Sequence, residues 1–261
     1  MDNPQPQTDQ ALYRKWRPHL WAEVVGQEPI VRTLQNAIRG GRVGHAYLFA
    51  GPRGTGKTTT ARLLAKAVNC TDEDLSHRPC DQCENCKAVN QGRFLDLIEI
   101  DAASNTSVDD VRDLREKINF SPSLGQFKVY IIDEAHMLTT EASNALLKTL
   151  EEPPEHVVFI LATTNPEKLI ETVRSRTVNI AFSKAGKDEI VRSLSRVIEG
   201  EKIKVEKETL DVIASACDGS FRDAIKILEE LVIRNIKIDK KDVEDYLFSK
   251  KIFNSDEFIG I

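Results

Sequence analysis

Short apolar runs alternate with amphipathic segments along the first two thirds of the chain. Five runs bounded by polar residues or glycine predict buried strands, at residues 45–50, 96–101, 127–136, 157–165 and 177–182. Apolar residues at helical spacing predict helices before and between them, at residues 30–39, 59–68, 104–117, 142–151 and 169–176. Strands that alternate with helices specify a parallel sheet with helices on both faces. The predicted fold class is therefore α/β.

The pattern changes at residues 183–186, after which every predicted element is a helix. These helices lie at residues 188–200, 207–217, 222–234 and 241–247. We therefore expect the chain to divide into four parts: a disordered arm at 1–10, an α/β domain at 11–182, a small all-helical domain at 183–247, and the start of a truncated third domain at 248–261.

Residues 51–58 read Gly-Pro-Arg-Gly-Thr-Gly-Lys-Thr and match the G-x-x-x-x-G-K-[ST] phosphate-binding loop (P-loop) of nucleoside triphosphatases. Glycines let the backbone turn its N–H groups toward a polyphosphate, Lys57 adds a cation, and the Thr58 hydroxyl can ligate Mg²⁺. A glycine-rich turn that binds nothing is the alternative, but this loop follows a predicted strand and opens a predicted helix. We expect nucleotide contacts from Gly51, Pro52, Arg53, Gly54, Thr55, Gly56, Lys57, Thr58 and Thr59.

Polar residues end two of the predicted strands. Asp133 and Glu134 follow the third strand, while Thr164 and Asn165 follow the fourth. Because the carboxyl ends of parallel strands meet at one edge of the sheet, these side chains should face the phosphates. We expect Asp133 to hold Mg²⁺ with Thr58, and Glu134 to act as the general base toward water.

Four of the five cysteines form the pattern C-x9-C-x2-C-x2-C. Four thiolates at this spacing suit one tetrahedral Zn²⁺, with no ligand position left open for catalysis, so a structural zinc module is expected at about residues 70–86. An iron–sulfur cluster and free cysteines are the alternatives, and His77 is a possible substitute ligand. Cys217 is expected in the core. The predicted zinc ligands are Cys70, Cys80, Cys83 and Cys86.

Composition and net charge limit the partners and the cellular location that the chain can have. The net charge of −5 excludes nucleic-acid binding through overall charge, so a DNA contact needs a local basic surface or an assembly. No apolar run approaches the roughly 20 residues that span a bilayer, and residues 1–10 lack the apolar segment of a secretory signal. We therefore expect a cytoplasmic protein. Trp16 and Trp21, among basic residues, are expected to pack on the core and not to stack on bases.

Several motifs together resemble AAA+ ATPases of the clamp-loader group. Besides the P-loop, these are Asp-Glu-Ala-His at 133–136, Ala-Thr-Thr-Asn at 162–165, Ser175-Arg176, and Gly-Ser-Phe-Arg-Asp-Ala at 219–224. The cysteine insertion and three further stretches, at 14–18, 99–104 and 146–153, are similar to the gamma/tau family of bacterial DNA polymerase III subunits. The resemblance covers about residues 11–247.

This resemblance implies a motor subunit that binds and hydrolyses ATP. Such subunits assemble with the delta and delta-prime subunits and other gamma/tau copies, open the beta sliding clamp and place it on primed DNA; a longer tau form also binds the polymerase and the helicase. By resemblance, ATP sits between the two domains with Val25 near the adenine, Thr164 is the sensor-1 residue and Arg222 the sensor-2 residue on the helical lid. Arg176 matches the arginine finger that acts in trans on ATP held by a neighbouring subunit.

Three departures from the family pattern affect these expectations. Thr177 replaces the usual cysteine after the finger arginine, and Asn105 and Ser107 are neutral where relatives often carry basic residues for DNA, which leaves Lys148 as a candidate contact. Because the oligomerising third domain is absent beyond residue 261, we expect this chain alone to be mostly monomeric with feeble ATPase activity. The alternatives are a stator-like subunit that does not hydrolyse ATP and another AAA+ enzyme, such as a branch-migration motor.

Overall fold

The computed structural model describes residues 10–104, 118–234 and 238–256, and it divides into two compact units. One unit, called the sheet unit here, spans Pro18–Ser183; the other, the helical unit, joins the chain up to Arg17 with the chain from Lys184 onward. The predicted helix at 104–117, with Asn105 and Ser107, the arm at residues 1–9 and the last five residues lie outside the described part.

The sheet unit contains a parallel sheet of five strands in the order β2-β3-β4-β1-β5. This confirms the predicted α/β class. The strands are β1 (Ala46–Ala50), β2 (Leu97–Asp101), β3 (Lys128–Asp133), β4 (Val157–Thr163) and β5 (Val178–Ala181). Their register pairs Ala50 with Thr163 and Asp101 with Asp133, so the last residues of these strands lie along one edge. Residues that follow the strands therefore meet at that edge.

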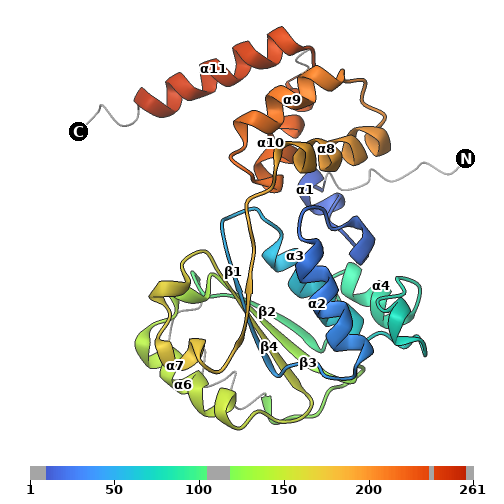
Figure 1. The fold of residues 1–261 in the computed structure, drawn as a ribbon, viewed down its shortest axis with the longest axis vertical. Coiled ribbons are helices and arrows are strands. Elements are labelled where there is room, and N and C mark those ends of the chain that lie inside the picture. Colours follow the sequence, from blue (N-terminus) through green and yellow to red (C-terminus); the bar gives the residue numbers. More distant parts are fainter. Residues whose placement is uncertain (1–9, 105–117, 235–237, 257–261) are drawn as a thin grey trace, which may run out of the picture. The chain divides into compact units, whose positions relative to one another are not determined.

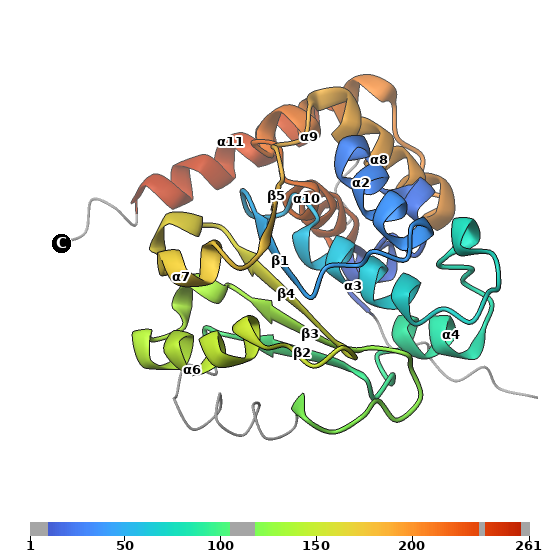
Figure 2. The same ribbon diagram turned by 60° about the horizontal axis from the view of Figure 1, so that its bottom comes forward.

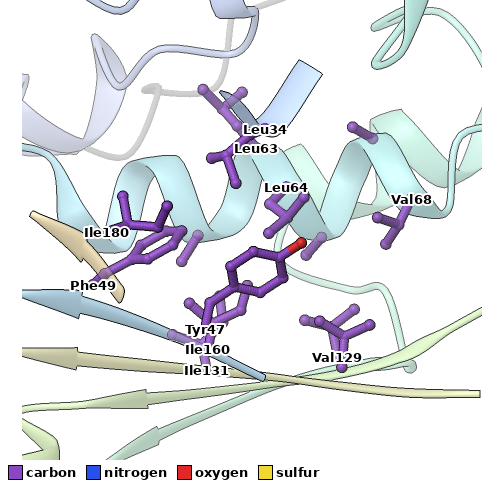
Figure 3. Close-up of a cluster of buried hydrophobic side chains, with 14 of the residues drawn as sticks. Leu34, Tyr47, Phe49, Leu63, Leu64, Val68, Val129, Ile131, Ile160 and Ile180 are labelled. Atoms are coloured by element: carbon purple, nitrogen blue, oxygen red, sulfur yellow. The ribbon is translucent and has the colours of Figure 1, made fainter. Parts of the chain in front are cut away.

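Helices cover both faces of this sheet (Figures 1 and 2). The helices of the sheet unit are α2 (Glu28–Arg39), α3 (Lys57–Val68), α4 (Glu84–Asn90), α6 (Thr140–Glu151) and α7 (Glu171–Arg174), of which α4 packs against α3. Short 3-10 turns lie at Trp21–Glu23, Leu75–His77, Ala135–Met137 and Pro166–Lys168. Two apolar clusters result, one with α2 and α3 and one with α6 and α7. Figure 3 shows Leu63 and Leu64 of α3 above Tyr47 and Phe49 of β1.

The helical unit consists of α1 (Leu12–Lys15), α8 (Lys187–Glu201), α9 (Lys207–Ala216), α10 (Phe221–Ile233) and α11 (Lys240–Asp256). The four predicted C-terminal helices are present, although α11 runs on past residue 247 into the segment where a third domain was expected to start. Cys217 is buried in this core, as predicted.

The N-terminal boundary differs from the prediction, because residues 11–17 pack with the helical unit and not with the sheet. The Trp16 ring lies against Gly200 so closely that a Cβ there would be 1.7 Å from it, and the Trp16 Nε1–H donates to Glu201 Oε1 at 2.7 Å. Leu12 N donates to Glu229 Oε1 at 2.8 Å. Both tryptophans pack on a core, but Trp21 belongs to the core of the sheet unit.

Candidate functional site: the phosphate-binding loop and the sheet edge

The P-loop is fixed to the sheet at its first residue. Gly51 has a φ of +151°, and a Cβ there would lie 2.3 Å from the carbonyl oxygen of Phe182, so only glycine fits. Its N–H donates to Thr163 O at 3.1 Å. At the other end, Gly56 adopts the left-handed conformation, with φ of 100°, and directly precedes α3. The loop therefore leads from the end of β1 into a helix N-terminus, where free N–H groups favour anions.

Lys57 is almost fully buried, with 7% of its surface exposed. Its Nζ donates to the carbonyl oxygens of Gly51 at 2.8 Å and Pro52 at 2.9 Å, both in its own loop. Burial lowers the pKa of the Lys57 ammonium, and the nearby Glu134 and Asp133 carboxylates act in the opposite direction. A buried cation whose hydrogen-bond partners are neutral can gain from an anion.

Thr58 and Asp133 meet although 75 residues separate them: the Thr58 Oγ1–H donates to Asp133 Oδ2 at 2.8 Å. The other carboxylate oxygen of Asp133 accepts from the N–H of Glu134 at 3.0 Å. Hydroxyl and carboxylate oxygens are the ligands that Mg²⁺ prefers. The pair therefore fits a magnesium ion bound beside the loop, as the sequence predicts.

Glu134 occupies the left-handed region, with φ of 48°, which is uncommon for a residue other than glycine. One of its carboxylate oxygens, Oε2, lies 3.3 Å from Thr164 Oγ1. Thr164 Oγ1 also lies 2.9 Å from Asn165 Oδ1, so its single proton serves one of these two acceptors at a time. The structure thus brings the predicted base and the predicted sensor-1 residue together.

His136 also belongs to this network, a role that the sequence pattern alone does not predict. Its Nδ1 lies 3.0 Å from Thr163 Oγ1 and 3.5 Å from Glu134 Oε2. In the sequence, the only indication of this role is its position two residues after Glu134, in the turn that follows β3. His136 thus links the ends of β3 and β4.

The other predicted site residues lie elsewhere. Arg176 follows α7, where its Nη2 pairs with Glu151 Oε1 of α6 at 2.7 Å and its Nη1 donates to Thr172 O at 2.9 Å. Arg222 belongs to the helical unit, and its guanidinium stacks on the ring of Tyr13, 4.8 Å from the ring centroid. Val25 is partly buried, in the segment before α2.

The four predicted zinc ligands form one cluster, in which the sulfur atoms all lie within 4.8 Å of one another. A tetrahedral zinc with Zn–S bonds of about 2.3 Å separates its sulfurs by about 3.8 Å, and Cys83 Sγ lies 4.0 Å from Cys70 Sγ. Backbone N–H groups point at the sulfurs, with Cys80 N 3.4 Å from Cys70 Sγ and Cys86 N 3.4 Å from Cys83 Sγ. The donor set therefore fits a structural zinc ion, and His77 lies outside it, exposed, beside Asp74.

The thiols of this cluster differ in acidity. Burial alone would raise the pKa of the Cys83 thiol, but N–H groups of Thr71 and Cys86 outweigh it and lower that pKa to about 6. Burial raises the pKa of Cys70 and of Cys86. A thiolate already stabilised by N–H donors is suited to be the first ligand of a metal.

Residues 26–186 match the family model described as "DNA polymerase III, delta subunit", and residues 189–231 match the model "DNA polymerase III clamp loader subunit, ATPase lid domain". The chain belongs to the DNA polymerase III clamp-loader family. The two matches correspond to the sheet unit and to part of the helical unit of this clamp-loader chain.

Curated relatives of the chain carry the name of the gamma/tau subunits. It is 50% identical over 238 residues to DNA polymerase III subunit tau of Bacillus subtilis, a match that covers 91% of this chain and 42% of that protein. It is 47% identical over 221 residues to subunit gamma of Buchnera aphidicola, covering 85% of this chain and 60% of that one. The chain thus spans only part of the length of these relatives, and the resemblance inferred from the motifs is confirmed.

Solved structures confirm the AAA+ fold. The Thermotoga maritima RuvB Holliday junction branch migration motor matches with a TM-score of 0.65 and 21% identity, over 88% of this chain and 71% of that one. Identity this low shows a shared fold and no shared activity. Among the described residues, no helix combines the length and the apolar character needed to cross a membrane.

Proposed function

We propose that this clamp-loader chain is the subunit that binds and hydrolyses ATP to open the sliding clamp and load it on primed DNA. The observation that carries this proposal is the hydrogen-bonded set at the sheet edge. Thr58 contacts Asp133, Glu134 contacts Thr164, and the buried Lys57 ammonium stands in the adjacent loop. A subunit that only assembles does not need these side chains at one edge, whereas phosphoryl transfer uses each of them.

Phosphate binding is proposed for the loop and the first turn of α3. The β- and γ-phosphates of ATP would take the place of the two loop carbonyls as acceptors for Lys57 Nζ, and the loop N–H groups would hold the remaining oxygens. Thr58 and Asp133 would hold Mg²⁺, which supplies positive charge where the phosphate oxygens gain negative charge. Val25 is proposed to lie near the adenine, on the family resemblance alone.

Hydrolysis needs a base that takes a proton from water, and Glu134 is the proposed base. Its Oε2 lies near Thr164 Oγ1, which follows β4, and near His136 Nδ1, which follows β3. The Thr164 hydroxyl would turn from Glu134 to donate to Asn165 or to the substrate. In that position Thr164 would orient the water or the γ-phosphate. His136 would hold the carboxylate in place.

Two arginines are proposed to complete the site, one from a neighbouring subunit and one from the helical unit. Arg176 would act in trans as the arginine finger, exchanging Glu151 for the γ-phosphoryl oxygens of ATP on a neighbouring subunit. Arg222 would act as the sensor-2 residue of the lid. The proposed zinc is structural, held by the four cysteines of the insertion.

The proposed partners are those of the family: the delta and delta-prime subunits, other gamma/tau copies, the beta sliding clamp and primed DNA, with the polymerase and the helicase added for a longer tau form. Lys148, exposed on α6, remains the candidate DNA contact. We propose a cytoplasmic, replisome-associated location.

ATPase activity measured with delta, delta-prime, clamp and primed DNA tests this proposal. We expect Lys57→Ala to abolish the stimulated turnover, and Arg176→Ala to lower it by about 10³-fold or more, as for arginine fingers in related chemistry. Arg174→Ala, which removes an exposed neighbouring arginine, is the matched control and should keep turnover within about twofold. Full stimulated turnover by Lys57→Ala would refute the ATPase; full turnover by Arg176→Ala would refute the finger alone.

A further inference from the structure

Helix α3 touches both the proposed nucleotide site and the cysteine cluster. Its first two residues are Lys57 and Thr58, and Cys70 follows its last residue, Val68, by two positions. Twelve residues of α-helix extend over about 18 Å. The helix is buried along most of its length, so displacement at one end reaches the other.

The far end of α3 is fixed by Asn69, which ends the helix and is itself 2% exposed. Asn69 Nδ2 donates to Ala65 O at 3.1 Å, and Asn69 Oδ1 accepts from Phe127 N at 2.8 Å, just before β3. Asn85 Nδ2 in the cysteine insertion donates to Asn69 O at 2.8 Å. The helix end therefore has direct contacts with the insertion.

Lys66 connects α3 to other parts of the sheet unit. Its side chain is 1% exposed and its ammonium has three acceptors. These are His19 O at 2.9 Å, Asn90 Oδ1 at 2.8 Å and the Asp81 carboxylate. An ammonium has three protons, so Lys66 is fully satisfied. The acceptors lie in three stretches of the chain: the start of the sheet unit, the last residue of α4 and the turn between Cys80 and Cys83.

Asp81 is held by the same turn that places the zinc ligands. It lies between Cys80 and Cys83 in the left-handed conformation, with φ of 60°, and Asn90 Nδ2 donates to its Oδ1 at 2.7 Å. An apolar side chain at position 66 would fill the space without the cost of burying a charge. The buried charge instead ties α3 to the position of the metal-binding turn.

From these contacts we propose that zinc binding and nucleotide binding are coupled through α3, with Lys66 as the positioning residue of the coupling. The proposal rests on the function proposed above, because it needs a nucleotide at Lys57 and Thr58. Zinc orders the turn that carries Asp81, Asp81 and Asn90 hold Lys66, and Lys66 fixes the helix whose first turn meets the phosphates. The cysteine insertion thereby acquires a role in the affinity for nucleotide.

Coupling of binding sites is reciprocal, so nucleotide must change the affinity for zinc by the same factor as zinc changes the affinity for nucleotide. Zinc affinity is measured on the full chain by competition with a chromophoric chelator, with and without saturating Mg²⁺–ADP. We expect ADP to tighten zinc binding at least about fivefold, the lower end of typical coupling. This readout does not depend on ATPase activity.

Three variants locate the coupling. In Lys66→Met the ADP effect on zinc affinity should fall to within about twofold of none, the size expected once the link is lost. Asn90→Ala removes one acceptor, leaves the buried charge paired with Asp81 and should reduce the effect in part, even if Lys66→Met does not fold. Lys87→Met, an exposed lysine of α4 beside Cys86, is the control and should retain the full effect.

The outcomes separate this inference from the proposed function. Unchanged zinc affinity in a wild-type chain that binds ADP would refute the coupling alone. An undiminished effect in both Lys66→Met and Asn90→Ala would refute the role of Lys66. A chain that binds zinc but no nucleotide would refute the proposed function and the coupling with it.

Discussion

The two ends of α3 each bury a lysine, and the two ammonium groups have different kinds of partners. Lys57 donates to neutral carbonyl oxygens within six residues of itself. Lys66 donates to one carboxylate and to two neutral oxygens, and its partners lie 15 to 47 residues away. Burial of a lysine therefore does not by itself indicate a phosphate site. A buried ammonium whose hydrogen-bond acceptors are all neutral is the better indicator, and of these two lysines Lys57 has that arrangement.

Removal of zinc should have the largest effect on thermal stability, because the cysteine cluster adjoins the end of α3 that carries Lys66. A ligand present at about a thousand times its Kd stabilises the folded state by about 4 kcal/mol, which for a unit of this size corresponds to about 8–16 °C in Tm. We therefore expect a chelator to lower the Tm of the sheet unit by that amount, as followed by circular dichroism. Excess Zn²⁺ should restore it; an unchanged Tm after verified metal removal would contradict a structural zinc site.

Replacement of each lysine by methionine should show that Lys66 contributes mainly to stability and Lys57 mainly to nucleotide binding. Lys66→Met leaves the Asp81 carboxylate, which is 30% exposed, without a cation and with Asn90 as its donor. A loss of about 2–3 kcal/mol in the free energy of unfolding is therefore expected, at or below the lower end of the range for fully buried pairs. Lys57→Met should leave that free energy within about 1 kcal/mol but weaken ATP binding about 10- to 150-fold, the size of a charge-assisted hydrogen bond of about 1.5–3 kcal/mol.

Denaturant unfolding and nucleotide titration of both variants check these values, with each variant serving as the control for the other. Equal losses of stability in the two would show that the Lys57 ammonium, too, holds the fold.

The smallest expected effect is a dependence of nucleotide affinity on alkaline pH. Burial lowers the pKa of Lys57, and bound phosphates would raise it again, so binding takes up a proton above the pKa of the free chain. The affinity for ADP should therefore fall as pH rises through this lowered pKa, at most about tenfold per pH unit and at lower pH than for an ordinary lysine near 10.4. Titrations between pH 7 and 10 check this.

Lys57→Arg keeps its charge at every pH in that range. Its nucleotide affinity should therefore be nearly independent of pH. The same fall in affinity in Lys57→Arg and in wild type would assign the titration to another group.

The sequence predicted the parts that depend on periodicity and on the ends of strands. The strands are recognisable as apolar runs, and parallel pairing then predicts that the residues after them meet at one edge. In the structure Thr58 contacts Asp133, and Glu134 contacts Thr164. The cysteine cluster was equally predictable, because its ligands lie within 17 consecutive residues and their spacing is itself the signal.

Contacts between distant residues escaped prediction. Trp16 packs on Gly200, and no local pattern connects positions 184 residues apart, so the sequence does not reveal that residues 11–17 pack with the helical unit. Nothing in the sequence around Lys66 predicts its buried contacts, because its acceptors, in His19, Asp81 and Asn90, lie 15 to 47 residues away. The roles of Arg176 and Arg222 came from family resemblance and not from spacing.

The attachment of α1 to the helical unit also has a consequence for synthesis on the ribosome. The partner of the Leu12 N–H, Glu229, is 217 residues further along the chain. At about 5–20 residues per second, the first helix leaves the ribosome roughly 10–40 s before that partner is made. During this interval Leu12, Tyr13 and Trp16 lack the core that covers them in the finished protein. The start of the chain is therefore among the last parts to reach its native place.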